Sequence, residues 1–341
     1  MIKYIKILIC FIVMFKLVIA EVLAPDISFI DLPLSAQSGS LGNTYLSDVG
    51  NPTNLLQNPA SIWFGDRINT NRKFVKNIFF KSSITNFELI DGNQNFNLMG
   101  SIQYGKYFTF GAGYVEHNQK EINQYDENAN YLGEFDFKEY ASILGLATEF
   151  SGINLGISGG VINYLFNGLN QSSNESSIGY AAIGLLINDR YVDKNNWNNK
   201  FLKNVIPQYF SLHATTKNIF YKDSSKNSMY KTIVGFKGNY YADLNKLHLL
   251  SVLLDYNSNN GISDDVYSLG FQYTINISGS NNFLSFNLGL KDINSIDQIT
   301  YGVEYKNLNK YIDFSIAFAN LNTPWNEEYS IITFKIFYDK K

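Results

Sequence analysis

Cysteine is almost absent from this chain: among its 341 residues only Cys10 is a cysteine. Cys10 lies in an N-terminal stretch with lysines at positions 3, 6 and 16 and an apolar run over residues 7–18. This charge order and length are typical of a secretory signal peptide, which we expect to be residues 1–20 and to be cleaved after Ala20. A membrane anchor is the alternative, but Lys16 leaves the run short for a bilayer span. The mature chain would contain no thiol, which excludes disulfides and cysteine-ligated metals.

Charge is also scarce. Only 17% of the residues are Asp, Glu, Lys or Arg, and the formal net charge is −3. Removal of residues 1–20 takes away three lysines and no acidic residue, so the charge moves from −3 to −6. We expect no binding to nucleic acid, because a mildly acidic exported chain has no electrostatic attraction for phosphates.

After Arg72 the sequence has no long amphipathic helix. It has short segments in which large apolar residues alternate with small or polar ones. Residues 267–277 read YSLGFQYTINI, with large apolar residues at odd positions and small or polar ones at even positions. Successive residues of a strand point to opposite faces. A soluble sandwich also alternates, but these bulky, often aromatic faces and the near-membrane-spanning length favour a barrel that turns its apolar face to lipid. Similar patterns occur at residues 284–291, 299–306, 312–319 and 332–338.

About fourteen such segments follow one another between residues 76 and 338, and single-chain bacterial barrels have even strand numbers. The predicted fold is therefore all-β, a transmembrane antiparallel β-barrel of about 14 strands, formed by residues 74–341. Long connections are predicted at residues 118–135, 166–176 and 189–206, which we expect on the outer side of the membrane.

Two Asn-Pro pairs, Asn51-Pro52 and Asn58-Pro59, precede the first strand. Proline removes a backbone donor and disfavours helix in the residue before it, so each pair should start or stop a short element. A barrel of this size is too wide to be filled by its own side chains. Residues 21–73 are therefore predicted to form an N-terminal hatch inside the barrel.

Residues 29–62, FIDLPLSAQSGSLGNTYLSDVGNPTNLLQNPASI, resemble the N-terminal signature of PorV/PorQ-type outer-membrane proteins, relatives of the FadL fatty-acid transporter. Gln37 stands where Arg is usual, and Gly50-Asn51-Pro52 stands where an Asp pair is common. The resemblance extends to residues 133–150 and 211–220. The matching residues are Ser35, Ala36, Leu41, Gly42, Asn43, Asp48, Asn58, Pro59 and Ala60.

The resemblance implies a location in the bacterial outer membrane, in contact with its lipid, and two possible roles. PorV/PorQ-like members work with secretion-system proteins or exported cargo in type IX secretion. FadL-like members pass hydrophobic ligands through the lumen. The chain length and the LPLSA sequence favour protein secretion or surface attachment, with FadL-like transport as the alternative and a porin-like role as a third possibility.

No enzymatic activity, cofactor or metal is predicted. Residues 156–160 fit the G-x-S-x-G pattern of hydrolases, but that pattern requires a strand-to-helix elbow, and here it lies within a predicted strand. The three histidines lack metal-ligand spacing. Polar residues on the inward phase of the strands are instead expected to line the lumen: Ser158, His213, Lys217, Glu304, Lys306 and Lys335, with Lys231, Lys237, Asp255, Lys291 and Asp313 as further inward charges.

Overall fold

The computed structural model describes residues 33–44, 49–63, 78–88, 94–104, 108–125, 131–150, 153–168, 171–191, 207–221, 229–241, 247–258, 266–277, 282–293, 296–307, 312–322 and 328–340. The expected signal peptide (1–20), Asp48, and residues 21–32 and 64–73 of the expected hatch lie outside these residues. No helix within them is long and apolar enough to cross a membrane.

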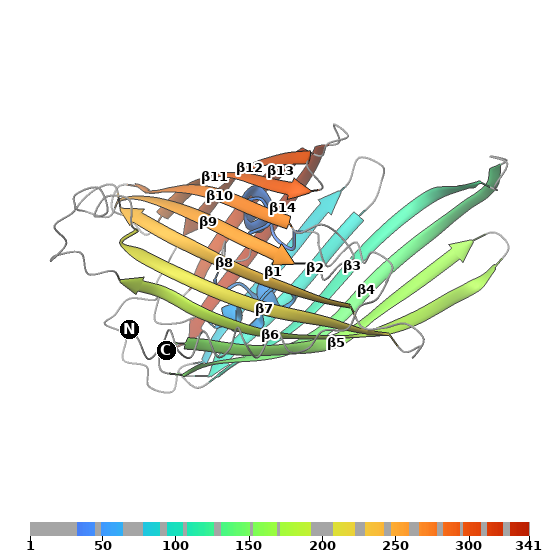
Figure 1. Ribbon diagram of the computed structural model, residues 1–341, viewed down its shortest axis with the longest axis horizontal. Helices are drawn as coiled ribbons and strands as arrows, with labels where there is room; N and C mark the ends of the chain where they lie inside the picture. Colours follow the sequence, from blue (N-terminus) through green and yellow to red (C-terminus); the bar gives the residue numbers. More distant parts are fainter. Residues whose placement is uncertain are drawn as a thin grey trace.

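The described residues form fourteen antiparallel strands that close into a barrel, which confirms the predicted fold (Figure 1). Each strand pairs with its neighbours in sequence, and pairing of the first strand with the last closes the barrel. The strands are β1 (Ile78–Glu88), β2 (Gln94–Tyr104), β3 (Phe108–Tyr125), β4 (Tyr131–Phe150), β5 (Ile153–Gly168), β6 (Gln171–Tyr191), β7 (Tyr209–Tyr221), β8 (Met229–Tyr241), β9 (His248–Ser258), β10 (Val266–Asn276), β11 (Asn282–Ile293), β12 (Ile296–Asn307), β13 (Ile312–Asn322) and β14 (Glu328–Lys340).

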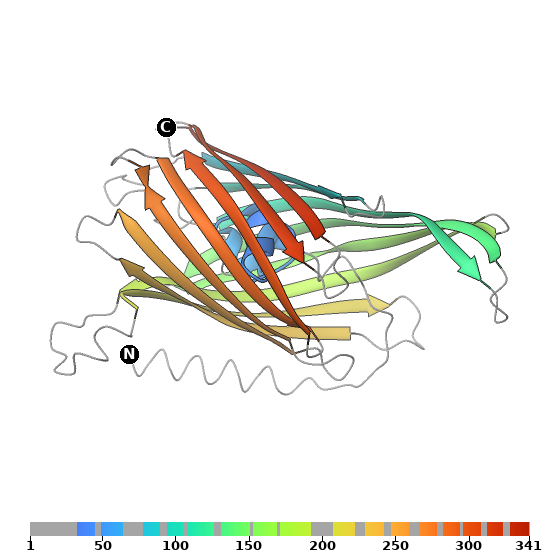
Figure 2. The ribbon, with the colours of Figure 1, turned by 90° about the horizontal axis from the view of Figure 1, so that it is seen from above.

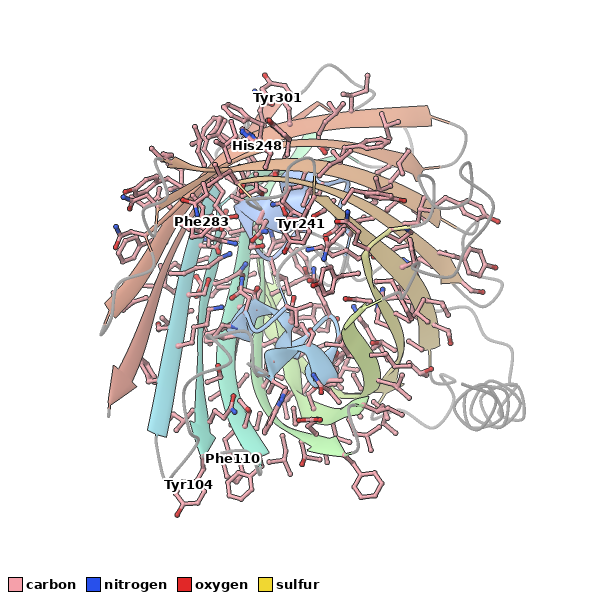
Figure 3. All side chains as sticks on the ribbon, turned by 90° about the vertical axis from the view of Figure 1, so that its left-hand side faces the viewer. Tyr104, Phe110, Tyr241, His248, Phe283 and Tyr301 are labelled. Carbon is pink, nitrogen blue, oxygen red and sulfur yellow. The ribbon has the colours of Figure 1, made fainter. Side chains whose placement is uncertain are left out.

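The apolar phase of the strands faces outward, as predicted. Phe271 and Leu288 are 37% and 46% exposed, whereas their sequence neighbours Gln272 and Asn287 are buried. Figure 3 shows other aromatic side chains, such as Tyr104 and Phe110, pointing away from the barrel. An apolar surface that continues around a barrel would aggregate in water, so this surface requires hydrocarbon around it.

The strands β3–β6 are longer than the others and project beyond the barrel at the end opposite the chain termini (Figure 1). The predicted loops at 118–135 and 166–176 are therefore wrong for most of their length: β3 continues to Tyr125, β4 begins at Tyr131, and β5 and β6 leave only residues 169–170 between them. The expectation that the long connections share one side is also wrong. The strand order puts the β6–β7 connection at the opposite end from the β3–β4 and β5–β6 connections.

Residues 33–44 and 49–63, which we call the luminal segment, lie inside the barrel (Figures 2 and 3), and every one of them is buried. They form α2 (Ala36–Ser40), η2 (Pro52–Leu55) and η3 (Pro59–Ile62). The two Asn-Pro pairs each start a 3₁₀ helix, as predicted. The Asn51 side chain accepts a hydrogen bond from Thr53 N and that of Asn58 from Ala60 N, while proline occupies the first helical position.

Candidate functional site

The N-terminal part of the luminal segment is held by hydroxyl and amide groups of the first, second and last strands. Ala36 N donates to Thr333 Oγ1 at 2.8 Å, and Thr85 Oγ1 and Asn97 Nδ2 donate to Leu34 O at 3.1 and 3.3 Å. A buried backbone group that is outside a sheet must find a side-chain partner or lose a hydrogen bond. Polar residues on the inner face supply those partners here.

Three of the predicted lumen residues form one charged cluster beside α2. The Glu304 side chain is fully buried, and its two oxygens lie 3.1 Å from Lys306 Nζ and 3.5 Å from Lys335 Nζ. Lys335 Nζ also donates to Gln37 Oε1 of α2 at 3.1 Å. A buried carboxylate is tolerated only when it is paired, and this pairing also links the wall to the luminal segment.

The predicted Leu41-Gly42-Asn43 motif follows α2 and contacts β11 and β12. Gly42 and Asn43 have φ values of 71° and 61°, in the left-handed region that Gly and Asn adopt most readily. A Cβ atom on Gly42 would lie 2.6 Å from the Leu290 carbonyl oxygen. Gly42 N donates to Thr300 Oγ1 at 3.1 Å. Backbone conformation and close approach therefore both require glycine at this position.

Residues 58–60, the Asn58-Pro59-Ala60 turn, rest directly on two glycines of the wall. A Cβ atom on Gly156 of β5 would lie 2.2 Å from Ala60 N, and one on Gly184 of β6 would lie 2.0 Å from Asn58 Oδ1. These two glycines are directly opposite each other in the β5–β6 ladder. They form a flat floor that allows the turn to approach the backbone of the wall.

A chain of three buried polar side chains connects this turn to β7 and β9. Asn58 Oδ1 accepts from Ala60 N at 3.0 Å, which fixes the amide orientation and places Nδ2 3.4 Å from His213 Nδ1. Because Asn58 Nδ2 donates there, His213 Nδ1 is the acceptor and its Nε2 carries the proton. His213 Nε2 then donates to Asp255 Oδ1 at 3.0 Å. The Asn58–His213–Asp255 chain is the most direct polar link between the luminal segment and the wall of β7–β9.

Lys231, Lys237 and Asp255 are also buried and Lys291 is half-buried, whereas the side chain of Asp313 lies outside the described part of the structure. Ser158 and Lys217 are 7% and 1% exposed, and Lys217 lies directly opposite Lys231 in the β7–β8 ladder. Lys217 is four residues from His213 on the same face of β7. No group of three or more His, Asp and Glu side chains in the described part of the chain could hold a metal ion.

The inner wall of β2–β6 carries an apolar patch among polar residues such as Asn97 and Ser158, whereas the alternation of the C-terminal strands predicts a small or polar inner face. Its buried side chains join Leu34, Leu55, Leu56, Ile62 and Trp63 of the luminal segment in one hydrophobic cluster. Where this patch lies, both faces of the strands are apolar, so the alternation of apolar and polar residues is weak there. The wall residues of the cluster are Met99, Val115, Ala141, Ile143, Ala147, Ile162, Tyr164, Ile178, Tyr180 and Ala182.

Several residues of the site were not singled out from the sequence. Gly156 and Gly184 carry the Asn58 turn, Gly145 lies under Leu55, and Tyr180 OH donates to Leu56 O at 2.7 Å. The available signal was the occurrence of glycine on the inward phase of three consecutive strands. A strand glycine often marks a close approach of another backbone.

No protein-family model matches the sequence, and no curated protein matches it either. Solved structures do match its fold. The toluene transporter TodX of Pseudomonas putida aligns over 90% of this chain and 97% of its own, with 12% identity and a TM-score of 0.50. The toluene transporter TbuX of Ralstonia pickettii aligns over 90% and 98%, with 11% identity and a TM-score of 0.51.

A TodX mutant described as a monoaromatic hydrocarbon channel gives a TM-score of 0.52 at 11% identity, over 90% of this chain and 98% of its own. The chain has a FadL-like barrel fold. Identities this low show the fold alone. Assignment to the PorV/PorQ-type proteins therefore stays a prediction from the sequence.

Proposed function

We propose that this protein is a non-enzymatic outer-membrane channel for hydrophobic small molecules and that the luminal segment is its gate. The observation that carries the proposal is the apolar patch on the inner wall of β2–β6. An aqueous porin has a polar lumen, because water in an apolar channel costs free energy. Here Ile143 and Ile162 are buried inside the barrel together with the apolar residues of the luminal segment.

The proposed gate has a simple physical basis. The luminal segment covers the apolar wall with Leu55, Leu56 and Ile62, so displacement of the segment exposes a surface that favours apolar ligands over water. Polar contacts hold the segment to β7 and β14, through Asn58 and Gln37 respectively. The toluene transporters that share the fold support small, uncharged hydrocarbons as the ligand class.

Uptake of labelled toluene by cells that express the full chain tests this proposal. We expect Ile143→Asn to lower uptake roughly tenfold, since an amide in an apolar site costs on the order of 1–3 kcal/mol. Thr215→Asn is the matched control, because Thr215 is equally buried on the polar half of the inner wall. Equal uptake by both variants and by the wild type, with all three folded, would contradict the proposal.

The secretion role predicted from residues 29–62 has that sequence resemblance as its support. It makes a different prediction in the same cells. If deletion of the gene abolished surface attachment of exported proteins while toluene uptake stayed unchanged, and affinity purification recovered secretion-channel subunits, the PorV/PorQ-like role would replace transport.

A further inference from the structure

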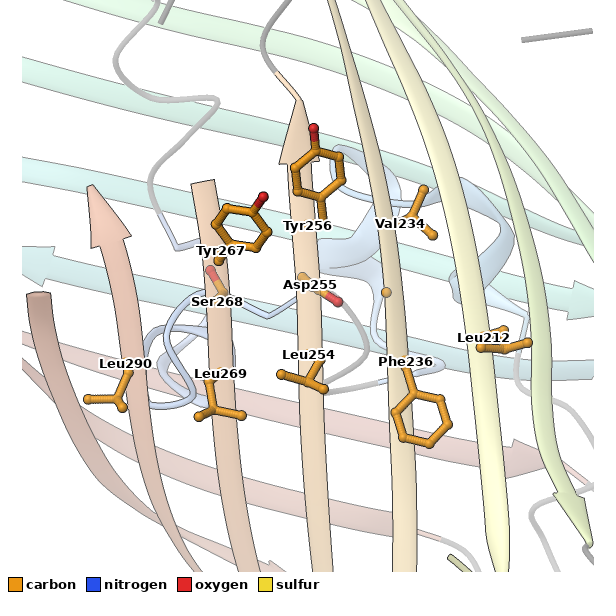
Figure 4. Close-up of a pocket in the computed structure, with 11 residues that line it drawn as sticks. Leu212, Val234, Phe236, Leu254, Asp255, Tyr256, Tyr267, Ser268, Leu269 and Leu290 are labelled. Carbon is orange, nitrogen blue, oxygen red and sulfur yellow. The ribbon is translucent and has the colours of Figure 1, made fainter. Parts of the chain in front are cut away.

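An apolar groove crosses the outer face of the barrel over β7–β11 (Figure 4). It has a volume of about 500 Å³. One wall is a row of side chains that are direct partners across four consecutive strand pairings. This row consists of Leu212, Phe236, Leu254, Leu269 and Leu290.

The other wall is a parallel row two residues further along the strands. Val234 is paired with Tyr256, and Tyr256 with Tyr267. Between the two rows, the backbone of Gly235, Asp255 and Ser268 forms the floor of the groove, because the side-chain positions of these residues face the lumen. Residues two apart on a strand are separated by about 7 Å, so the groove is narrow, and it runs across the strands rather than along them.

The shape of the groove fits a chain rather than a ring. One wall spans five strands, and four strand spacings correspond to a length of about 19 Å, while the other wall spans β8–β10. Its lining is almost wholly apolar side chains, and it is continuous with the lipid-facing surface that includes Phe271 and Leu288. Hydrocarbon chains of the bilayer are therefore the molecules that meet this groove in the membrane.

The wall formed by Val234, Tyr256 and Tyr267 has two tyrosines, a residue type typical of a membrane interface. The rings of Tyr256 and Tyr267 have centroids 5.2 Å apart, and the two side chains are 37% and 58% exposed. Tyr256 lies two residues before the end of β9 and Tyr267 is the second residue of β10, at the same end of the barrel as the projecting parts of β3–β6. Tyrosines concentrate at the level of lipid headgroups, with the ring in hydrocarbon and the hydroxyl in the polar layer.

We propose that this groove binds one acyl chain of a membrane lipid, with the lipid headgroup beside Tyr256 and Tyr267. The chain lies between the two side-chain rows and covers the backbone at Gly235. The lipid belongs to the leaflet at the end of the barrel opposite the chain termini. This site is separate from the lumen, and it does not depend on which molecules the lumen passes.

Native mass spectrometry of the detergent-solubilised full chain, titrated with palmitoyl-oleoyl-phosphatidylethanolamine, tests the proposal. Val234→Trp places a bulky side chain in the groove while keeping a lipid-facing apolar residue. Ile316→Trp on β13 is the matched control, because Val234 and Ile316 are 46% and 47% exposed. Wild type and Ile316→Trp should each retain one lipid. Retention by Val234→Trp should fall roughly tenfold, as expected if about two buried methylene groups lose contact.

Unboiled samples on a gel establish that all three proteins are folded barrels. Equal lipid retention by Val234→Trp and Ile316→Trp overturns the proposal, as does the absence of a retained lipid in the wild type. Reduced toluene uptake by Val234→Trp with unchanged lipid retention also overturns it, because the groove would then serve the permeant. A loss of lipid with unchanged toluene uptake supports the proposal and leaves the lumen function unaffected.

Discussion

Asn58 Nδ2 lies 3.4 Å from His213 Nδ1, so the first residue of the Asn58-Pro59-Ala60 turn is bonded to a strand that begins about 150 residues later in the chain. The same Asn58 side chain caps η3 through its other atom, Oδ1. One amide therefore sets both the local conformation of the turn and its position against the wall. Predictions about the luminal segment can be tested at this contact and at the surfaces around it.

Gly156→Ala is expected to displace the luminal segment, because the new Cβ atom would lie 2.2 Å from Ala60 N, a backbone atom. Single-channel recording in planar bilayers should show an ion conductance that the wild type lacks. Gly100→Ala is the control: its Cβ atom would meet nothing closer than 3.7 Å. If Gly156→Ala conducts ions no better than the wild type, the luminal segment accommodates the new methyl group without displacement, and the prediction is wrong.

Asp255→Asn retains the shape of the side chain but removes the charge that accepts from His213 Nε2. A hydrogen bond to a charged group contributes about 1.5–3 kcal/mol, so the link to Asn58 should weaken. Hydrogen–deuterium exchange of residues 49–63 should accelerate roughly tenfold or more. Asp136→Asn, on an exposed part of β4, should leave that exchange rate unchanged, and an equal rate in both variants would argue against the link.

Glu304→Gln leaves Lys335 buried without its carboxylate partner, since Lys335 Nζ lies 3.5 Å from Glu304 Oε1. Removal of one partner of a buried ion pair costs on the order of 3 kcal/mol. The temperature at which the barrel unfolds on a gel should fall clearly. Glu149→Gln provides the comparison, because Glu149 is exposed at the end of β4 and its loss should have almost no effect.

Phe286→Arg tests which face of β11 meets lipid. Phe286 is 46% exposed near the centre of the strand, and a lipid-facing arginine at mid-membrane costs about 2–4 kcal/mol. Assembly of the folded barrel in vesicles should be impaired, whereas Phe286→Trp should assemble normally. Normal assembly of both variants would show that this face is not in hydrocarbon.

The strands of the C-terminal half could be predicted from the sequence because lipid and lumen impose opposite demands on successive residues. Phe271 and Gln272 are adjacent in sequence and lie on opposite sides of the wall. The ends of β3–β6 could not be predicted in this way. Residues 119–125 of β3 read QKEINQY, without alternation of apolar and polar residues, yet Gln119 and Ile122 to Tyr125 pair with β4.

Those features of the candidate site that depend on short stretches of sequence could also be predicted. Proline after asparagine predicts where η2 and η3 begin, and the inward phase of β7 places His213 and Lys217 on the lumen side. The pairing of His213 with Asn58 could not be derived. The pairing depends on the register between neighbouring strands around the barrel and on the close approach of Asn58 to Gly184. Neither can be read from a single segment of the sequence.

The bond from Ala36 N to Thr333 Oγ1 spans 297 positions of the chain. The luminal segment is synthesised before any strand, but the surface that binds it is incomplete until β14, the last strand, is in place. The contacts of the luminal segment therefore cannot be complete before the barrel closes, and an unclosed intermediate exposes both the apolar patch of the inner wall and the apolar residues that cover it. Such late, long-range contacts make folding slow, so this barrel depends on protection from aggregation until its final strand is inserted.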